Sequence, residues 1–172
     1  MKVTHVNQLK ALRRKLQKKK SNFTAEHEFK GADELPLSQE ELDTAVELNQ
    51  IITVMLKGQQ QFPAFQFDST EQIYPALQEH LPRLLAARSS WDICFWLFTE
   101  QSITLKRAVP NAARLRDISV EEMLKLGKQA AEQTERYEGR PIDVATSGNS
   151  EVFEACVENL LNPDYRDIPV LS

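Results

Sequence analysis

The stretch from Phe62 to Asp68 constrains the fold of this chain most strongly. Its sequence, Phe-Pro-Ala-Phe-Gln-Phe-Asp, contains three of the chain's eight phenylalanines. It follows a β-branched run at residues 51–56 and a Lys57-Gly58 turn, which is typical of a β-hairpin. Pro63 has no amide hydrogen for a strand ladder, so we expect its strand to lie at an edge or to carry a bulge there. We therefore predict one small hairpin over about residues 51–67.

The most apolar helix is expected soon after this hairpin, from Trp91 to about Glu100. It is apolar nearly all round, which predicts a central position in the core. Each of its two tryptophans buries a large area. Phe65 and Phe67 are two residues apart, so they would share one strand face and pack against this helix. The predicted core motif consists of Phe62, Phe65, Phe67, Trp91 and Trp96.

Apolar residues recur at helical spacing in the rest of the chain, so the predicted fold class is mainly α. Ser38 and Ser119 each precede a glutamate by three residues, a capping-box pattern that opens a helix. Residues 21–37 carry little periodicity and are broken by Gly31 and Pro36, so we expect a linker or irregular segment there. Residues 101–118, with Pro110, are expected to form a connection. The further helices are expected over residues 5–20, from Ser38 for about three turns, from about Thr70 to Leu85, over 119–137 and over 151–161.

Composition limits the cell compartment and the kind of partner. No apolar run approaches the roughly 18–20 residues that span a bilayer, so no membrane partner is expected. Cys94 and Cys156 both fall in expected helices and do not form a disulfide framework. Buried free thiols in a reducing cytoplasm are the simpler interpretation, and we expect a cytoplasmic protein.

No residue constellation points to catalysis. The chain has neither a phosphate loop nor a dinucleotide fingerprint, and its three histidines lack metal-site spacing. Cys94 with His80 is the best nucleophile–base pair, yet Cys94 lies mid-helix among aromatics, which raises a thiol pKa. We therefore expect no enzyme activity, no catalytic residue, no metal and no cofactor.

The net charge of −4 hides two blocks of opposite sign. Residues 1–25 carry eight Lys or Arg and no acid, whereas residues 26–48 carry eight acids and one base. Long cations on a helix can neutralise phosphates without reading bases, so the N-terminal helix is a candidate nucleic-acid arm. A solvated helix face, or one docked on the acidic segment, remains the alternative. The candidate nucleic-acid-binding residues are Lys10, Arg13, Arg14, Lys18 and Lys19.

Several motifs, in order, resemble the toxin-binding domain of Xre/MbcA/ParS-type antitoxins. In that family an aromatic-Pro-x-aromatic-Gln-Phe-Asp motif ends a hairpin, and a helix with a proline near its start follows. A Trp-rich helix comes next, then a Gly-Arg-x-Pro-like turn with an apolar-Asp pair and a Gly-x-x-Glu helix start. The corresponding residues here are Phe62–Asp68, Tyr74-Pro75-Ala76-Leu77, Ser90-Trp91-Asp92, Trp96-Leu97, Gly139-Arg140-Pro141-Ile142-Asp143 and Gly148-Asn149-Ser150-Glu151-Val152.

The resemblance implies a non-enzymatic antitoxin that binds and neutralises a cognate RES-type toxin, an NAD-consuming protein. Such antitoxins often form homo-oligomers and repress their own operon, so operator DNA is a second implied partner. Residues 1–37 would form a basic helix and linker, and residues 38–172 the antitoxin-like domain. Two features depart from the family: an insertion at about 101–138 and the lack of a clear helix-turn-helix. The segment implied to contact the toxin is Asp164, Tyr165, Arg166 and Asp167.

Overall fold

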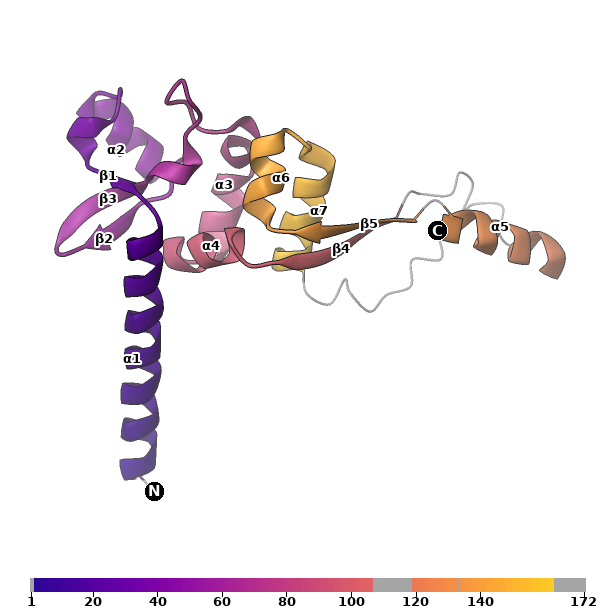
Figure 1. Ribbon diagram of the computed structural model, residues 1–172, viewed down its shortest axis with the longest axis horizontal. Coiled ribbons are helices and arrows are strands. Elements are labelled where there is room, and N and C mark those ends of the chain that lie inside the picture. Colours follow the sequence, from indigo (N-terminus) through magenta and orange to yellow (C-terminus); the bar gives the residue numbers. More distant parts are fainter. Residues whose placement is uncertain (1, 107–118, 133, 163–172) are drawn as a thin grey trace. The chain divides into compact units, whose positions relative to one another are not determined.

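The chain divides into two compact units, Met1–Trp96 and Leu97–Ser172, which are described separately. The computed structural model describes residues 2–106, 119–132 and 134–162 (Figure 1). These residues form helices with small antiparallel sheets, which confirms the predicted mainly α class with a small hairpin. The unit boundary lies within the Trp-rich helix, whereas the sequence suggested a division near residue 37.

The first unit combines four helices with a three-stranded antiparallel sheet of order β1-β3-β2. Two short 3₁₀ turns, η1 (Ala32–Glu34) and η2 (Ala64–Gln66), follow β1 and β3. The strands are β1 (Phe29–Lys30), β2 (Val54–Leu56) and β3 (Gln59–Pro63). The helices are α1 (Lys2–Glu26), α2 (Gln39–Glu47), α3 (Pro75–Ala87) and α4 (Ser90–Leu97).

The predicted hairpin is present, and it ends earlier than expected. Lys57 and Gly58 form its two-residue turn with φ of 52° and 80°, as a type I′ turn requires. Strand β2 pairs only with Gln59–Gln61, whereas β1 pairs with Phe62 and Pro63. Pro63 therefore lies at the strand end, beyond the β2 ladder, and its missing amide hydrogen costs no bond to β2. The next residue, Ala64, donates its N–H to the carbonyl of Glu28 at 2.9 Å.

The core of the sheet lies under α2. Glu41 and Ser38 form the predicted capping box, with N–H···O distances of 2.8 and 3.3 Å. The Glu41 carboxylate accepts from the Ser38 N–H and hydroxyl, and these two bonds lower its pKa. The buried members of this core come from the segment after β1, from α2, from the residue pair before β2 and from both sides of η2: Leu35, Leu42, Ile51, Phe62 and Phe67. Partly buried side chains pack against this cluster: Ala32, Leu37, Ala45, Val46 and Ile73.

Gln66, the polar residue inside the phenylalanine-rich stretch, is fully buried. Its Oε1 accepts the N–H of Ile52 at 2.7 Å, and its Nε2 donates to the carbonyl of Ile52 at 3.0 Å. The same Nε2 also donates to the carbonyl of Pro63 at 3.0 Å. The side chain thus takes the place of a strand partner for Ile52, because it satisfies both of that residue's backbone groups.

Asp68 ends the stretch by closing a tight turn. Its Oδ1 accepts from the N–H and hydroxyl of Thr70, each at 2.7 Å, and from the N–H of Gln72 at 3.1 Å. These bonds, the Thr70 hydroxyl first, lower the carboxyl pKa. The chain then enters α3 with Pro75 in its first turn, as predicted, and Pro82 is accommodated inside the helix.

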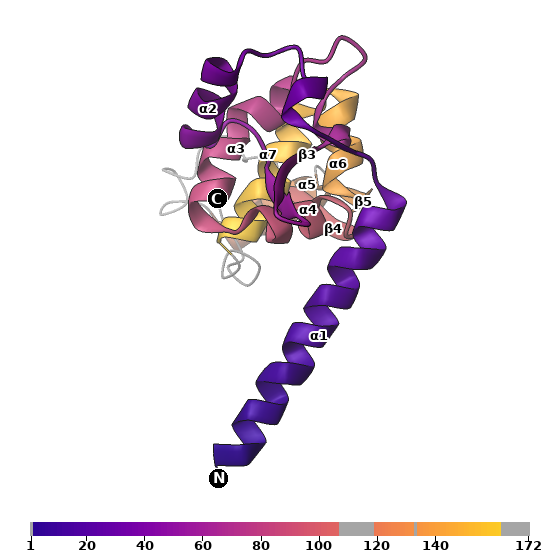
Figure 2. The same cartoon turned by 90° about the vertical axis from the view of Figure 1, so that its left-hand side faces the viewer.

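The prediction that residues 21–37 form a linker is wrong, because α1 continues to Glu26 and β1 joins the sheet. The anchor is Phe23, which is 7% exposed. Its ring centroid lies 5.6 Å from that of Phe95, 6.2 Å from Phe65 and 6.3 Å from Trp91. Edge-to-face rings at such distances attract one another beyond the area they bury. Phe23 therefore fixes the C-terminal end of α1, the end at which this helix joins the rest of its unit (Figure 2).

The prediction that Phe65 and Phe67 share one strand face is also wrong. They flank Gln66 in and after the η2 turn, not in a strand. Phe67 joins the cluster under α2, and Phe65 packs on the Phe23 ring of α1. In α4, Trp96 is buried as predicted, whereas Trp91 is only half-buried. The helix ends at Leu97, and residues 93–97 are all buried, in agreement with the predicted core position.

The second unit contains a β-ribbon that the sequence did not predict. Strands β4 (Gln101–Lys106) and β5 (Thr134–Gly139) pair antiparallel, from Gln101 opposite Gly139 to Lys106 opposite Thr134. The expected connection over 101–118 therefore begins as a strand. The helix expected to reach Tyr137 is α5 (Val120–Glu132), which ends five residues earlier. Its capping box at Ser119 is confirmed.

Two short helices complete the second unit, α6 (Pro141–Ser147) and α7 (Ser150–Leu161). Gly148 ends α6 with φ of 78°, a left-handed conformation that favours glycine. Asn149 then caps α7 by accepting the N–H of Val152 at 3.2 Å. The buried side chains of α7 lie at helical spacing on one side of the helix: Val152, Phe153, Cys156 and Val157.

Replacing Gln66 by leucine tests the buried amide. We expect Gln66→Leu to destabilise the protein by about 2–4 kcal/mol, because both backbone groups of Ile52 lose their partner in a buried site. The matched control is Gln60→Leu on exposed β3 surface, expected to stay within about 0.5 kcal/mol. Urea unfolding measures both, and equal effects would contradict the assignment.

Replacing Phe23 by alanine tests the anchor of α1. We expect a loss of about 3 kcal/mol, because a large ring leaves a packed cluster. Trp91 would lose a ring neighbour, so its fluorescence should shift to the red. Leu12→Ala is the control on the same helix, where the side chain is 61% exposed, and it should leave both stability and emission unchanged. A neutral Phe23→Ala would mean that α1 is not held by this ring.

Candidate functional site

The exposed part of α1 carries the most distinctive surface of the first unit. Every side chain from residue 7 to residue 19 is exposed, including all five candidate nucleic-acid-binding residues. Lys10, Arg14 and Lys18 recur every four residues and so follow one face. Lys19 differs, because its ammonium lies 4.1 Å from the centroid of the Phe95 ring. Sequence reasoning thus located the exposed cations correctly, and their role stays a prediction.

The apolar face of α1 is uncovered in this structure. Leu9, Leu12 and Leu16 are 56%, 61% and 46% exposed. The sequence predicted an amphipathic helix from their spacing, and three- and four-residue steps do place them on one side. Phe23 follows Leu16 by seven residues and extends the same line into the aromatic cluster. We call this line of side chains, Leu9, Leu12, Leu16 and Phe23, the seam of α1. It is buried at Phe23 and exposed at the three leucines.

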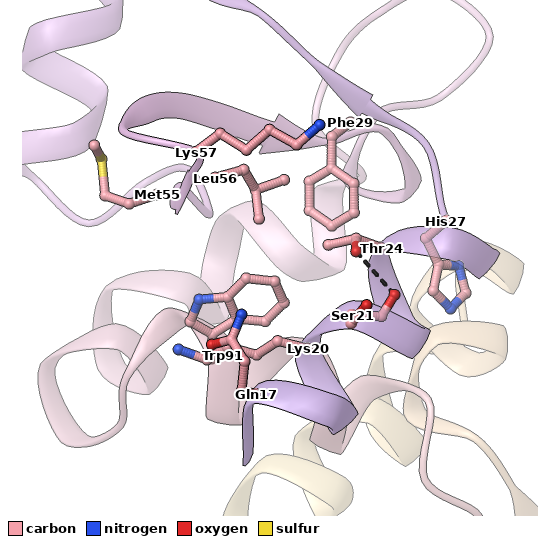
Figure 3. Close-up of a pocket in the computed structure, with 10 residues that line it drawn as sticks. All are labelled: Gln17, Lys20, Ser21, Thr24, His27, Phe29, Met55, Leu56, Lys57 and Trp91. Carbon is pink, nitrogen blue, oxygen red and sulfur yellow. Dashed lines mark hydrogen bonds between the residues drawn. The ribbon is translucent and has the colours of Figure 1, made fainter. Parts of the chain in front are cut away.

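A groove lies beside α1, between its last turns and the hairpin (Figure 3). Its volume is about 520 Å³. Met55, Leu56 and Lys57 lie across the groove from Lys20 and Trp91. The remaining lining residues add polar and aromatic side chains: Gln17, Ser21, Thr24, His27 and Phe29.

The charges in this groove favour an anionic ligand. The Lys20 ammonium lies 5.0 Å from the centroid of the Trp91 ring, a cation–π geometry. Lys57 adds a second cation on the opposite wall. The sequence did not predict that Lys20, Phe29 and Lys57 line one groove. Residue 57 is distant in sequence from α1, and the pairing of the strands brings the two together.

Most of the core motif and both thiols are buried. Phe62 is fully buried, and Phe67 and Trp96 are each 8% exposed. Cys94 is fully buried as predicted, and desolvation raises its pKa to about 12. The same cause raises the pKa of Cys156 to about 12. Both thiols therefore stay protonated at neutral pH, and thiolate is the nucleophilic form of cysteine.

The Gly-Arg-Pro-Ile-Asp motif forms the start of α6. Arg140 binds the carboxylate of Asp143 through two hydrogen bonds, of 2.8 Å from Nε and 2.9 Å from Nη2. Its guanidinium carbon also lies 5.8 Å from the centroid of the Phe98 ring. Pro141 occupies the first helical turn, where its lack of an amide hydrogen is tolerated. The motif thus has a structural role as a helix start.

The implied toxin-contacting residues Asp164, Tyr165, Arg166 and Asp167 lie outside the described residues. Within residues 2–106, 119–132 and 134–162, no group of three or more His, Cys, Asp or Glu could hold a metal ion. A search of the described helices found none that is both long and apolar enough to cross a bilayer.

Comparisons with known proteins returned no relative. No family model, no curated protein and no solved structure matches this chain.

Proposed function

We propose that this chain is a non-enzymatic, antitoxin-like regulatory protein of the cytoplasm that binds and neutralises a cognate RES-type toxin. The observation that supports it most is the order of the resembling motifs along the chain and the local structure each adopts. The phenylalanine-rich stretch ends a hairpin and precedes α3, which has Pro75 in its first turn. Both tryptophans then lie on α4.

The later motifs follow the same order in the second unit. Gly139-Arg140-Pro141 opens α6, and Gly148-Asn149 separates α6 from α7. Glu151 lies in the first turn of α7, as in the Gly-x-x-Glu helix start of the family. The resembling motifs therefore mark hairpin ends and helix starts.

Because these motifs have structural roles, the contact surface belongs elsewhere. Phe62, Gln66 and Phe67 are buried and unavailable to a partner. Under the proposal, the toxin contacts the last helix and the segment Asp164–Asp167 that follows it. The ribbon β4–β5 with α5 occupies the place of a short loop of the family.

Co-expression tests the antitoxin proposal. The full chain is produced together with the protein encoded by the neighbouring reading frame, which under the proposal is a RES-type toxin. We expect the full chain to restore growth and cellular NAD and to co-purify with the toxin. A variant ending at Asn162 removes Asp164–Asp167 and should weaken binding about tenfold or more, since a few residues carry most interface energy.

The matched control is Gln60→Ala, an exposed change on β3 that should protect as well as the unmodified chain. Circular dichroism of the shortened chain confirms that α7 remains folded. No protection by the full chain would reject the proposal. Full protection by the shortened chain would reject only the assigned contact.

DNA binding through α1 is the second candidate, and the exposed cations of that helix favour it. Alanine at Arg13, Arg14, Lys18 and Lys19 together should abolish retardation of DNA from upstream of its own reading frame. A plot of log affinity against log salt concentration falls with a negative slope, and each lost phosphate contact should make that slope less steep by about 0.9. Alanine at Arg88, an exposed cation outside both α1 and the groove, is the control. An unchanged shift in the fourfold variant would rule this function out.

A further inference from the structure

We propose that α1, over residues 8–20, is a docking site for an acidic amphipathic helix of another protein. The partner helix would bury an apolar seam against Leu9, Leu12 and Leu16 and place Glu or Asp on both sides of that seam. These residues lie at the opposite end of the sequence from the proposed toxin-contacting segment, and the inference does not depend on that contact.

The spacing of the leucines favours a helix as the occupant. Steps of three and then four residues leave a narrow apolar line, as at the a and d positions of a coiled coil. The next d position is Lys19, whose ammonium lies over the Phe95 ring. Phe23, one heptad after Leu16, is again apolar and is buried against Trp91 and Phe95. The packed end of the seam shows that this face of α1 is suited to burial.

The charges beside the seam determine which charge a partner helix must carry. With Leu9 at position a and Leu12 at d, Arg13 and Lys20 fall at e, and Lys15 falls at g. Both edges of the seam are therefore cationic, and residues 1–25 contain no acid. Opposite charges at e and g set partner choice in paired helices, so this helix fits one with acidic flanks.

The same charges oppose pairing of α1 with a second copy of itself. In a parallel pair, Lys15 of one helix would face Lys20 of the other, twice over. In an antiparallel pair, the e positions face one another, so Arg13 and Lys20 would again meet cations. Like charges at these positions act against a homodimer of α1.

Two other classes of occupant fit the surface less well. A helix that lies on a membrane presents a wide apolar face to the lipid, whereas α1 has one narrow line of leucines. A nucleic-acid arm uses its cations for phosphates and leaves the leucines exposed without a role. A helical protein partner uses both features of α1 at once.

The helix is prepared for docking before the partner arrives. Isolated helices of this length are marginal in water, so most unattached segments must be ordered at a cost in affinity. Here the aromatic cluster fixes the C-terminal end of α1, and Lys19 and Lys20 lie over the Phe95 and Trp91 rings. The N-terminal part stays clear of the other elements of its unit (Figures 1 and 2).

A designed peptide tests the proposal in the full-length protein. The probe has about three heptads with leucine at a and d and glutamate at e and g, and is monomeric because its glutamates repel. We expect micromolar binding by calorimetry that weakens with salt. Leu12→Ser should weaken it at least about tenfold. The variant with glutamate at Arg13, Lys15 and Lys20 should no longer bind this peptide. It should instead bind a second peptide that has lysine in place of glutamate at e and g.

The control variant is Lys10→Glu, Lys18→Glu, which changes charge on α1 away from the seam and should weaken binding less than threefold. Thermal unfolding of each variant verifies the fold. Absence of binding, equal binding of both peptides, or no switch on charge reversal would overturn the proposal. Three further outcomes would also overturn it, in each case if Leu12→Ser abolishes the interaction: dimerisation of the protein, binding to phosphatidylglycerol vesicles, or binding to duplex DNA. Each would show that the leucines contact another class of occupant.

Discussion

The fold of the first unit depends on the buried amide of Gln66. Its three hydrogen bonds join Ile52, before the hairpin, to Pro63 at the hairpin's end. The polypeptide leaves the sheet at this point, and a buried backbone pair at Ile52 would otherwise lack partners. A buried polar group destabilises the fold unless it has a hydrogen-bond partner. The Gln66 side chain supplies the partners for Ile52, and its bond to Pro63 fixes the conformation of the η2 turn.

This fixed turn divides the phenylalanines between two cores. Phe62 and Phe67 point into the cluster under α2, whereas Phe65 reaches the Phe23 ring of α1. A continued strand would have placed Phe65 and Phe67 on one face. Because η2 intervenes, the stretch joins the sheet core to the aromatic cluster that holds α1. The attachment of the N-terminal helix therefore depends indirectly on Gln66.

Local signals predicted most of the fold, and distant pairings account for what they missed. The capping boxes at Ser38 and Ser119 and the Lys57-Gly58 turn are short-range chemistry and were read correctly. The ribbon β4–β5 was missed, although Ile103 and Leu105 alternate with polar residues in β4, because the paired segment of β5 is mostly polar. Phe23 was missed because its neighbours Phe65 and Trp91 lie far away in sequence, yet its seven-residue step from Leu16 was a usable signal.

The candidate surface follows from the same division of α1. A residue such as Leu12 contributes to stability only by leaving water, and fully burying a leucine is worth about 1.5–3 kcal/mol. With more than half of its side chain exposed, most of that free energy is not used within the folded chain. Phe23, on the same line, is buried, so the free energy of removing its ring from water does stabilise the folded chain. Among the described residues of its unit, nothing covers the three leucines, so the apolar free energy of this part of α1 is available to a partner, and the cations of the helix restrict which partner can bind.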